Sequence, residues 1–350
     1  MKISELLFPN EYTADPEVAD LDITRPLSDP ATVHDGCLFL CLRGLRFDTH
    51  TLLKKIEEGG AAAAIVEKNV PIPPDIHLPI LRVESTREAL SLVFSRFYKN
   101  PEKELVMIGV TGTNGKTSTA TILYTILQAA GISAGLIGTA ECRYRDTLYT
   151  LPEEGDEKSA RLRTMTTPDP DILYPILRTM VAAGVTHVVM EVSSHALALE
   201  KVKPIPFDIG IFTNLSPEHM DFHNDMQSYL NAKAKLFSQC RVGIFNCDNE
   251  YAERVIEKAT CDIRRCGAVW NGERRATDIA LLGSEGVQYS YLAPGIRLKI
   301  RAPTRRLLGL QHHAGTDGGH RAWCFAPCSR QGTERQALRT GKNGARARFG

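Results

Sequence analysis

A glycine-rich segment, residues 110–117, has residue types and spacing that could bind the phosphates of a nucleotide. It reads Val-Thr-Gly-Thr-Asn-Gly-Lys-Thr between an apolar run and a helical pattern. Glycines let the backbone turn tightly, with N–H groups directed at phosphate oxygens, and the helix N-terminus adds partial positive charge. Lys116 can reach the β- and γ-phosphates, and the Thr117 hydroxyl can ligate Mg²⁺. The outer glycine of the general Walker pattern is missing, so this is a compact variant, with nucleotide-binding residues expected at Gly112, Thr113, Asn114, Gly115, Lys116 and Thr117.

Other side chains could complete a magnesium-dependent phosphate site. Glu191 ends an apolar run, and its carboxylate is a hard oxygen ligand suited to Mg²⁺. His219 could ligate a metal as a neutral imidazole. Tyr229, Lys233 and Phe237 are spaced by four residues, which places them on one face of an expected helix. Structural alternatives remain for each: a solvated or capping carboxylate, a packed histidine and a solvated lysine.

The elements that must position these residues indicate an α/β fold with a mostly parallel sheet. Short apolar runs predict strands at residues 105–110, 185–191, 207–213 and 242–246, and a helix is expected over residues 116–130. In a parallel sheet the ligand site lies beyond the carboxyl ends of the strands, where the polar residues above are found. Residues 1–100 show a separate strand–helix–strand alternation, and Asn100-Pro101 reads as a linker. We therefore expect a small N-terminal α/β domain over 1–100 and a central P-loop domain over 101–303.

Composition narrows the functional classes. The chain has 350 residues, 43% hydrophobic, and a net charge of +1, which gives no support for a nucleic-acid partner. No apolar run reaches the ~18–20 residues of a membrane span. Its nine cysteines lack the spacing of a zinc or redox hairpin, and we interpret them as reduced residues of a cytoplasmic protein.

Several ordered segments resemble the Mur ligase family, and within it the MurE type, which adds the third amino acid of the peptidoglycan stem peptide. The segments follow the phosphate loop at residues 164–168, 190–197, 212–215, 218–223 and 229–237. The resemblance covers roughly residues 20 to 300. It implies a monomeric enzyme in which ATP phosphorylates the D-Glu carboxylate of UDP-N-acetylmuramoyl-L-Ala-D-Glu. The amine of an amino acid, with meso-diaminopimelate the commoner case, then attacks the acyl phosphate.

The resemblance also implies roles for individual residues. Glu191 and His219 would hold Mg²⁺ with Thr117, and Lys233 would be carbamylated, which converts a cation into a metal ligand. Nucleotide binding would extend to Asn214. The N-terminal domain would bind the UDP part of the substrate, with substrate-binding residues expected at Ser28, Thr166, Thr167, Ser193 and Lys201.

Some positions depart from the family pattern. Lys201 stands where the family usually has arginine, and it offers charge without a bidentate fork. The usual Asp-Ser-Arg triplet of the UDP site reads Asp-Pro-Ala at residues 29–31, so Ser28 is a substitute candidate. The later acid–glycine–histidine string reads Asp-Thr-His at residues 48–50.

The segment from residue 304 to 350 differs from the rest of the chain. It contains no Val or Ile and has nine basic residues against Asp317 and Glu334, a net charge of +7. We expect an aberrant basic tail without a fixed fold, produced by a shifted reading frame in place of the family's C-terminal domain; a basic nucleic-acid arm is the weaker reading. Two rivals to the ligase remain: a non-catalytic nucleotide-binding fragment, and a folylpolyglutamate or cyanophycin synthetase relative.

Overall fold

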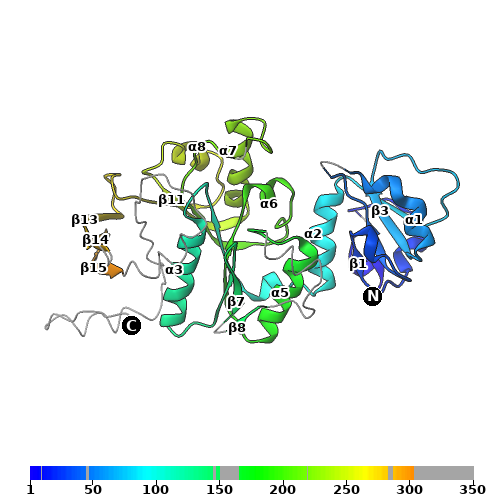
Figure 1. Cartoon of the computed structure of the whole chain (residues 1–350), viewed down its shortest axis with the longest axis horizontal. Coiled ribbons are helices and arrows are strands. Elements are labelled where there is room, and N and C mark those ends of the chain that lie inside the picture. The colour runs from blue at the N-terminus through cyan, green and yellow to red at the C-terminus, as the bar shows by residue number, and fades with distance from the viewer. Residues whose placement is uncertain are drawn as a thin grey trace.

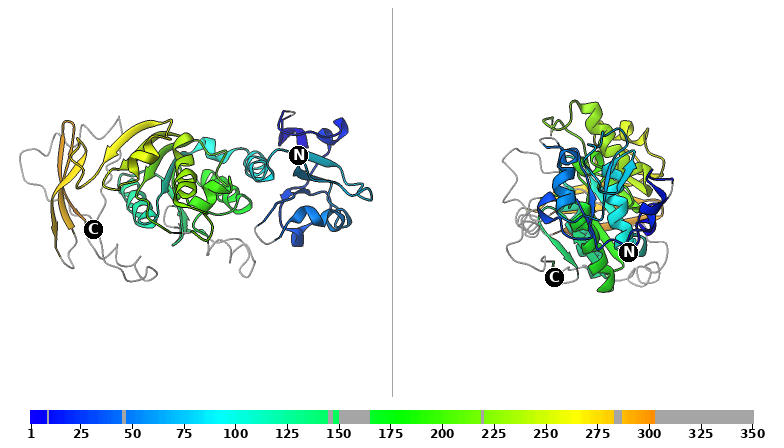
Figure 2. Two further views of the ribbon diagram at one scale, coloured as in Figure 1. Left: turned by 90° about the horizontal axis from the view of Figure 1, so that it is seen from above. Right: turned by 90° about the vertical axis from the view of Figure 1, so that its right-hand side faces the viewer.

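The computed structural model describes most of the chain as three sheets with their helices. The described residues are 1–8, 10–44, 47–144, 147–149, 165–218, 220–282 and 287–302. Figures 1 and 2 show the three sheets in a row, with the eight-stranded sheet in the middle. Among the described residues, no helix has the length and apolar character needed to cross a membrane. The basic segment after residue 303 lies outside the described residues.

The N-terminal part is a four-stranded parallel sheet in the order β1-β2-β3-β4. Its strands are Pro26–Leu27, Leu38–Leu40, Ala63–Glu67 and Ile80–Val83, with helices α1 (Leu53–Glu58) and α2 (Thr86–Phe97). Short 3-10 turns occupy Ile3–Glu5, Pro16–Asp20, Pro30–Thr32 and Thr49–Leu52. Ser85 begins α2, because its side chain accepts a hydrogen bond from the Glu88 N–H at the helix start. The expected strand–helix–strand alternation is present; the short strand β1 was not anticipated.

The central sheet has eight strands in the order β12-β11-β10-β5-β9-β6-β7-β8, and the six from β12 to β6 are parallel. These are β5 (Val106–Thr111), β6 (Ala134–Ile137), β9 (His187–Glu191), β10 (Phe207–Phe212), β11 (Cys240–Asn246) and β12 (Asp262–Cys266). The antiparallel edge strands are β7 (Cys142–Tyr144) and β8 (Thr147–Leu148). The mostly parallel sheet expected from the sequence is therefore confirmed.

Helices cover both faces of this sheet, so its strands are apolar on both sides. Ile108 and Val110 pack in one core cluster with α3 (Lys116–Ala129), whereas Met107 packs in the cluster of the opposite face. The opposite face carries α5 (Pro170–Ala182), the 3-10 turn η6 (Lys235–Ser238) and parts of α7 (Met226–Ala234). Two short helices, α6 (Ser194–Ala198) and α8 (Ala252–Ile256), complete the layer (Figure 1).

The N-terminal and central parts meet through α2 and α5, which contact each other. Between them the chain runs through η5 (Pro101–Glu104), and Lys99 and Asn100 have positive φ angles of 62° and 49°. Arg178 on α5 holds this junction, because its guanidinium donates to the carbonyls of Tyr98 and Lys99, both at 2.9 Å. The apolar core continues from α2 onto α5.

A three-stranded antiparallel sheet ends the described chain, formed by β13 (Arg275–Leu281), β14 (Val287–Ala293) and β15 (Ile296–Ala302). These residues were expected to belong to the central domain, and a separate antiparallel sheet was not anticipated. A bulge between Thr277 and Ala280 interrupts β13, and Asp278 within it has a φ of 52°.

Candidate active site

The phosphate loop joins the carboxyl end of β5 to the start of α3, and its glycines are needed for its shape. Gly112 and Gly115 have φ angles of 152° and 83°, which residues with a Cβ rarely adopt. A Cβ on Gly112 would also lie 1.9 Å from Oγ1 of Thr213. The loop therefore packs directly against the end of the neighbouring strand β10.

Residues that follow β10 fix the tip of the loop. Asn214 Oδ1 accepts the Asn114 N–H at 2.9 Å, and its amide donates back to the Asn114 carbonyl at 3.0 Å. The Thr213 hydroxyl donates to the same carbonyl at 2.7 Å, and the Thr113 N–H donates to the Asn214 carbonyl at 2.9 Å. Asn214, which was expected to bind nucleotide, thus holds the phosphate loop in shape. Through the loop it would affect the binding of a nucleotide.

Lys116 folds back over the loop that precedes it. Its Nζ donates to the carbonyls of Gly112 and Thr113, both at 2.9 Å. Burial lowers the pKa of this ammonium, while the carboxylates of Glu191 and Glu218 act in the opposite direction. The cation therefore lies directly over the turn in which phosphate would bind.

Glu191 ends β9 beside the loop and is 1% exposed. Its Oε2 accepts the Thr117 hydroxyl at 2.9 Å, and its Oε1 accepts the Thr139 N–H at 2.9 Å. Burial raises the pKa of the carboxyl, and the hydrogen bonds from Thr139 and Thr117 and the charge of Lys116 oppose that rise. Gly138 allows this approach, since a Cβ there would lie 2.2 Å from Oε1. The Thr117 hydroxyl and the Glu191 carboxylate, two oxygen groups that can ligate Mg²⁺, are thus adjacent.

Lys233 is 1% exposed on α7, and its Nζ lies 4.4 Å from the ring centroid of Tyr229. Burial lowers its pKa well below the usual range, the nearby Lys116 cation lowers it further, and Glu218 opposes both. The Tyr229 hydroxyl in turn pairs with Oγ1 of Thr113 in the loop, at 3.2 Å. The solvated-lysine alternative is therefore wrong, and α7 presents Lys233 to the loop.

The expected substrate-loop threonines lie next to Glu191. Thr166 accepts a hydrogen bond of 2.9 Å from Thr139, the residue whose N–H binds Glu191. The Thr167 hydroxyl donates to the Glu191 carbonyl at 3.0 Å and accepts the Ser193 N–H at 3.0 Å. Ser193 begins α6, and its hydroxyl accepts the N–H of Ala196, so Thr166, Thr167 and Ser193 belong to the network around β9.

Other expected residues lie farther from this network or outside the described chain. Lys201 forms an ion pair of 2.6 Å with Asp169, the residue that begins α5. Ser28 follows β1 in the N-terminal sheet and is half-buried. His219 lies outside the described residues. The nearby His223 is buried and pairs with the Ser194 hydroxyl at 2.9 Å, which gives this histidine a structural role.

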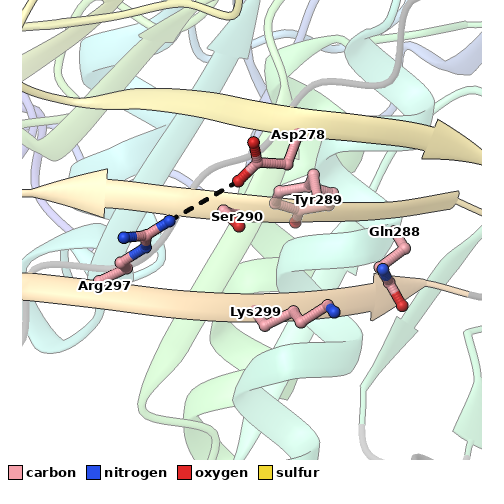
Figure 3. A pocket seen from close by; sticks show the side chains of 6 residues that line it. All are labelled: Asp278, Gln288, Tyr289, Ser290, Arg297 and Lys299. Carbon is pink, nitrogen blue, oxygen red and sulfur yellow. Dashed lines mark ion pairs between the residues drawn. The ribbon is translucent and has the colours of Figure 1, made fainter.

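A pocket on the antiparallel sheet is a separate feature (Figure 3). It is lined by Asp278, Gln288, Tyr289, Ser290, Arg297 and Lys299. None of the residues expected from the sequence to bind nucleotide, metal or substrate belongs to it. We therefore place the candidate active site at the carboxyl edge of β10, β5 and β9, not in this pocket.

Three interactions in the site were not identified from the sequence. Thr139 follows β6 and contacts both Glu191 and Thr166. Glu218 was noted only as part of a segment, yet its charge acts on both Lys116 and Lys233. The Tyr229 hydroxyl was not expected to reach Thr113. For Glu218 and Tyr229 the sequence signal was their position inside segments that had been assigned to the site, whereas Thr139 lies in none of those segments and had no such signal.

Comparison with known proteins agrees with this geometry. Residues 110–304, more than half of the chain, match the model of the Mur ligase middle domain. The chain is 38% identical over 304 residues to the UDP-N-acetylmuramoyl-L-alanyl-D-glutamate--2,6-diaminopimelate ligase of Chlorobium phaeobacteroides, which covers 85% of this chain and 57% of that protein. Identity to the ligase of the same name from Chlorobaculum tepidum is 40% over 234 residues, or 66% of this chain and 44% of that protein.

A solved structure of a ligase with this name shares the fold. Its TM-score is 0.68 at 22% identity, and the match covers 87% of this chain and 60% of that one. The chain spans about half the length of the curated relatives it matches. The match to the family model, which agrees with the arrangement around the phosphate loop, shows that the chain belongs to the Mur ligase family.

Proposed function

We propose that this chain is the catalytic core of an ATP-dependent ligase that adds the third amino acid to UDP-N-acetylmuramoyl-L-Ala-D-Glu. One observation carries the proposal: Lys116, Glu191 and Lys233 come from three separate elements and converge beside one phosphate loop. The name of these relatives supports the choice of substrates, because it describes a ligase of UDP-N-acetylmuramoyl-L-alanyl-D-glutamate and 2,6-diaminopimelate. By that reading the amino acid is diaminopimelate.

The roles follow from the chemistry of each group. Loop amides and Lys116 would bind and neutralise the ATP phosphates while the substrate carboxylate attacks the γ-phosphate. The resulting acyl phosphate supplies the leaving group that a carboxylate lacks, and the incoming amine displaces phosphate. Mg²⁺ would neutralise the crowded anions. Thr117, Glu191, His219 and a modified Lys233 would hold it, and the adjacent oxygens of the first two support this assignment.

The environment of Lys233 favours a carbamate. Only a neutral amine attacks CO₂, and burial beside Lys116 lowers the pKa of this lysine, so that more of it is neutral. The reaction releases one proton and leaves a carboxylate where a second cation would otherwise face Lys116. That product is an anionic oxygen ligand next to the proposed magnesium site.

The substrate would extend from the central part toward the N-terminal sheet. We propose residues 1–100 as the UDP-binding domain, with Ser28 at its carboxyl edge, and residues 101–303 as the ATP-binding domain. Thr166, Thr167 and Ser193 would contact the dipeptide end, and their hydrogen-bond network with Thr139 and Glu191 supports this assignment. Lys201 would contribute charge from its position beside Asp169.

A second candidate function is nucleotide binding without ligation. It needs only the phosphate loop, and that loop is held in shape by Asn214 and by the contacts of Lys116.

Measuring phosphate release distinguishes the two functions. The chain would be given ATP, Mg²⁺ and UDP-muramoyl dipeptide, with meso-diaminopimelate, L-lysine or no amino acid, and Lys116→Met would serve as the inactive control. Release that depends on both dipeptide and diaminopimelate supports the ligase. ATP binding by calorimetry without release under any condition supports the second function, and absence of ATP binding contradicts both.

A further inference from the structure

Two cysteine side chains are neighbours at the amino ends of the central strands, the end of the sheet opposite the phosphate loop. Cys240 begins β11 and Cys261 directly precedes β12, and these strands pair in parallel from Val242 and Asp262 onward. The Cys261 thiol acts on the pKa of the Cys240 thiol, so the two side chains are neighbours, and both residues are half-buried. Neither residue belongs to the candidate active site.

A pair of glycines provides the space for the two sulfurs. Gly210 on β10 and Gly243 on β11 lie in register. A Cβ on Gly243 would lie 2.7 Å from Sγ of Cys261, and a Cβ on Gly210 would lie 3.0 Å from Sγ of Cys240. The thiols therefore occupy space that ordinary side chains at these two positions would fill, and the packing around them holds them together.

Cys240 can be reached by a small molecule. It lines a pocket of about 540 Å³ at the amino ends of β5, β10 and β11. Charged side chains share this lining, among them Lys103, Asp208 and Arg241. By contrast, Cys37 and Cys41 are 0% exposed in the N-terminal sheet, so they offer a thiol reagent no access.

We propose that Cys240 and Cys261 form a dithiol modification site, which small disulfides entering this pocket convert into an internal disulfide. The Cys240 thiol loses its proton, and its sulfur attacks the small disulfide, which releases one small thiol and leaves a mixed disulfide. Cys261 then loses its proton and attacks Sγ of Cys240, which releases the second small thiol. Two protein thiols are oxidised and one small disulfide is reduced to two thiols.

The two steps respond differently to conditions. Burial, and then the neighbouring Cys261, raise the pKa of the Cys240 thiol, so the first step is slow at neutral pH and accelerates as pH rises. The second step is intramolecular between two neighbouring thiols, each packed against one of two glycines in register, so the mixed disulfide does not accumulate. The site thus responds to sustained oxidising conditions and does not act as a fast peroxide sensor.

Thiol exchange on the folded chain tests the proposal. A parent with Cys324→Ser and Cys328→Ser is incubated with hydroxyethyl disulfide at neutral and alkaline pH, then analysed by intact mass and peptide mapping. We expect a loss of two hydrogens and one linked peptide pair containing Cys240 and Cys261, formed faster at alkaline pH. Adding Cys261→Ser should replace this product by a stable mixed disulfide at Cys240, whereas Cys247→Ser should leave it unchanged.

Phenylarsine oxide, which bridges two nearby thiols, gives a second readout independent of oxidation. Cys240→Ser and Cys261→Ser should each bind one equivalent fewer than the parent, and Cys247→Ser should retain the equivalent bound at this site. Absence of the linked peptide after full reaction, or arsenical binding unchanged in both single variants, overturns the proposal.

Discussion

The Thr117 hydroxyl donates a hydrogen bond of 2.9 Å to Oε2 of Glu191, which joins the first turn of α3 to the end of β9. The other carboxylate oxygen accepts the Thr139 N–H. Neighbours on two elements therefore fix this buried carboxylate. Outer partners of this kind typically change metal affinity by about 10–100-fold when they are lost.

Replacing Gly138 with alanine should displace Glu191, because the new Cβ would lie 2.2 Å from Oε1. We expect the Mg²⁺ concentration that half-saturates ATP binding to rise by about 10–100-fold. Calorimetric titration of ATP at several Mg²⁺ concentrations measures this. Gly131→Ala is the control: its Cβ meets nothing within 4 Å, but its φ of 76° should lower stability by about 1 kcal/mol without altering Mg²⁺ dependence. If ATP binding depended on Mg²⁺ equally in both variants, Glu191 would not be a ligand of the metal.

Replacing Asn214 with alanine should loosen the tip of the phosphate loop. The variant loses both hydrogen bonds to Asn114, each with a net value of about 1 kcal/mol. We expect ATP affinity to fall by roughly 10–30-fold, since about 1.4 kcal/mol corresponds to a factor of ten. Asn231→Ala removes a comparable amide bonded to exposed Gln227 on α7 and should leave affinity unchanged. Unchanged affinity in the Asn214 variant would show that the loop keeps its shape without this clamp.

Much of the central sheet could be predicted because local sequence determines it. Apolar runs fix the buried strands, and glycines of positive φ fix the loop between β5 and α3. Parallel pairing then brings the carboxyl ends of β5, β9 and β10 together, which is why Lys116 and Glu191 were expected to be neighbours, whereas Asn214 was expected from the family resemblance.

Contacts between distant residues were less accessible from the sequence. On α3 the apolar Ile122 is 39% exposed, while the polar-tipped Tyr124 is buried, an arrangement that residue type does not reveal. Neither periodicity nor composition links Thr139 to Glu191, because a backbone N–H leaves no signature in residue type. The β13–β15 sheet was missed since its alternating polar residues lack the continuous apolar runs that marked the buried strands.

Replacing Lys233 with methionine should separate activity from stability. Methionine fills similar space without the charge, and Lys233 is a buried cation near Lys116. We expect phosphate release to fall by at least about 100-fold, as for loss of a main electrostatic contribution, with an unchanged or higher melting temperature. Labelled CO₂ should give a carbamate signal in the parent that the variant lacks.

Lys235→Met is the matched control two residues away. Lys235 pairs with Glu200 and is 43% exposed. Its loss should therefore cost at most about 1 kcal/mol of stability and leave phosphate release intact. A Lys233 variant as active as this control would remove Lys233 from the mechanism.

Glu102 should make stability depend on pH at the junction between the N-terminal and central sheets. It is 0% exposed, its Oε1 accepts the Ser95 hydroxyl at 2.7 Å, and its Oε2 has no hydrogen-bond partner among the described residues. Burial raises the pKa of this carboxyl above 4.5, more than Ser95, Lys103 and Arg178 lower it. Between pH 4.5 and the folded-state pKa the folded state therefore binds more protons than the unfolded state, and the free energy of unfolding should fall as pH rises through this interval.

Glu102→Gln tests this assignment, because glutamine keeps the shape and cannot ionise. Denaturant unfolding between mildly acidic and neutral pH should give a parent slope of up to about 1.4 kcal/mol per pH unit and a smaller slope for the variant. Glu104→Gln provides the comparison, since Glu104 is 50% exposed and pairs with Arg178 at 2.8 Å. Its slope should match the parent's. If Glu102→Gln also retained the parent slope, the junction would have to hold Glu102 ionised, and its unpartnered oxygen would then require a cation or water in the folded chain.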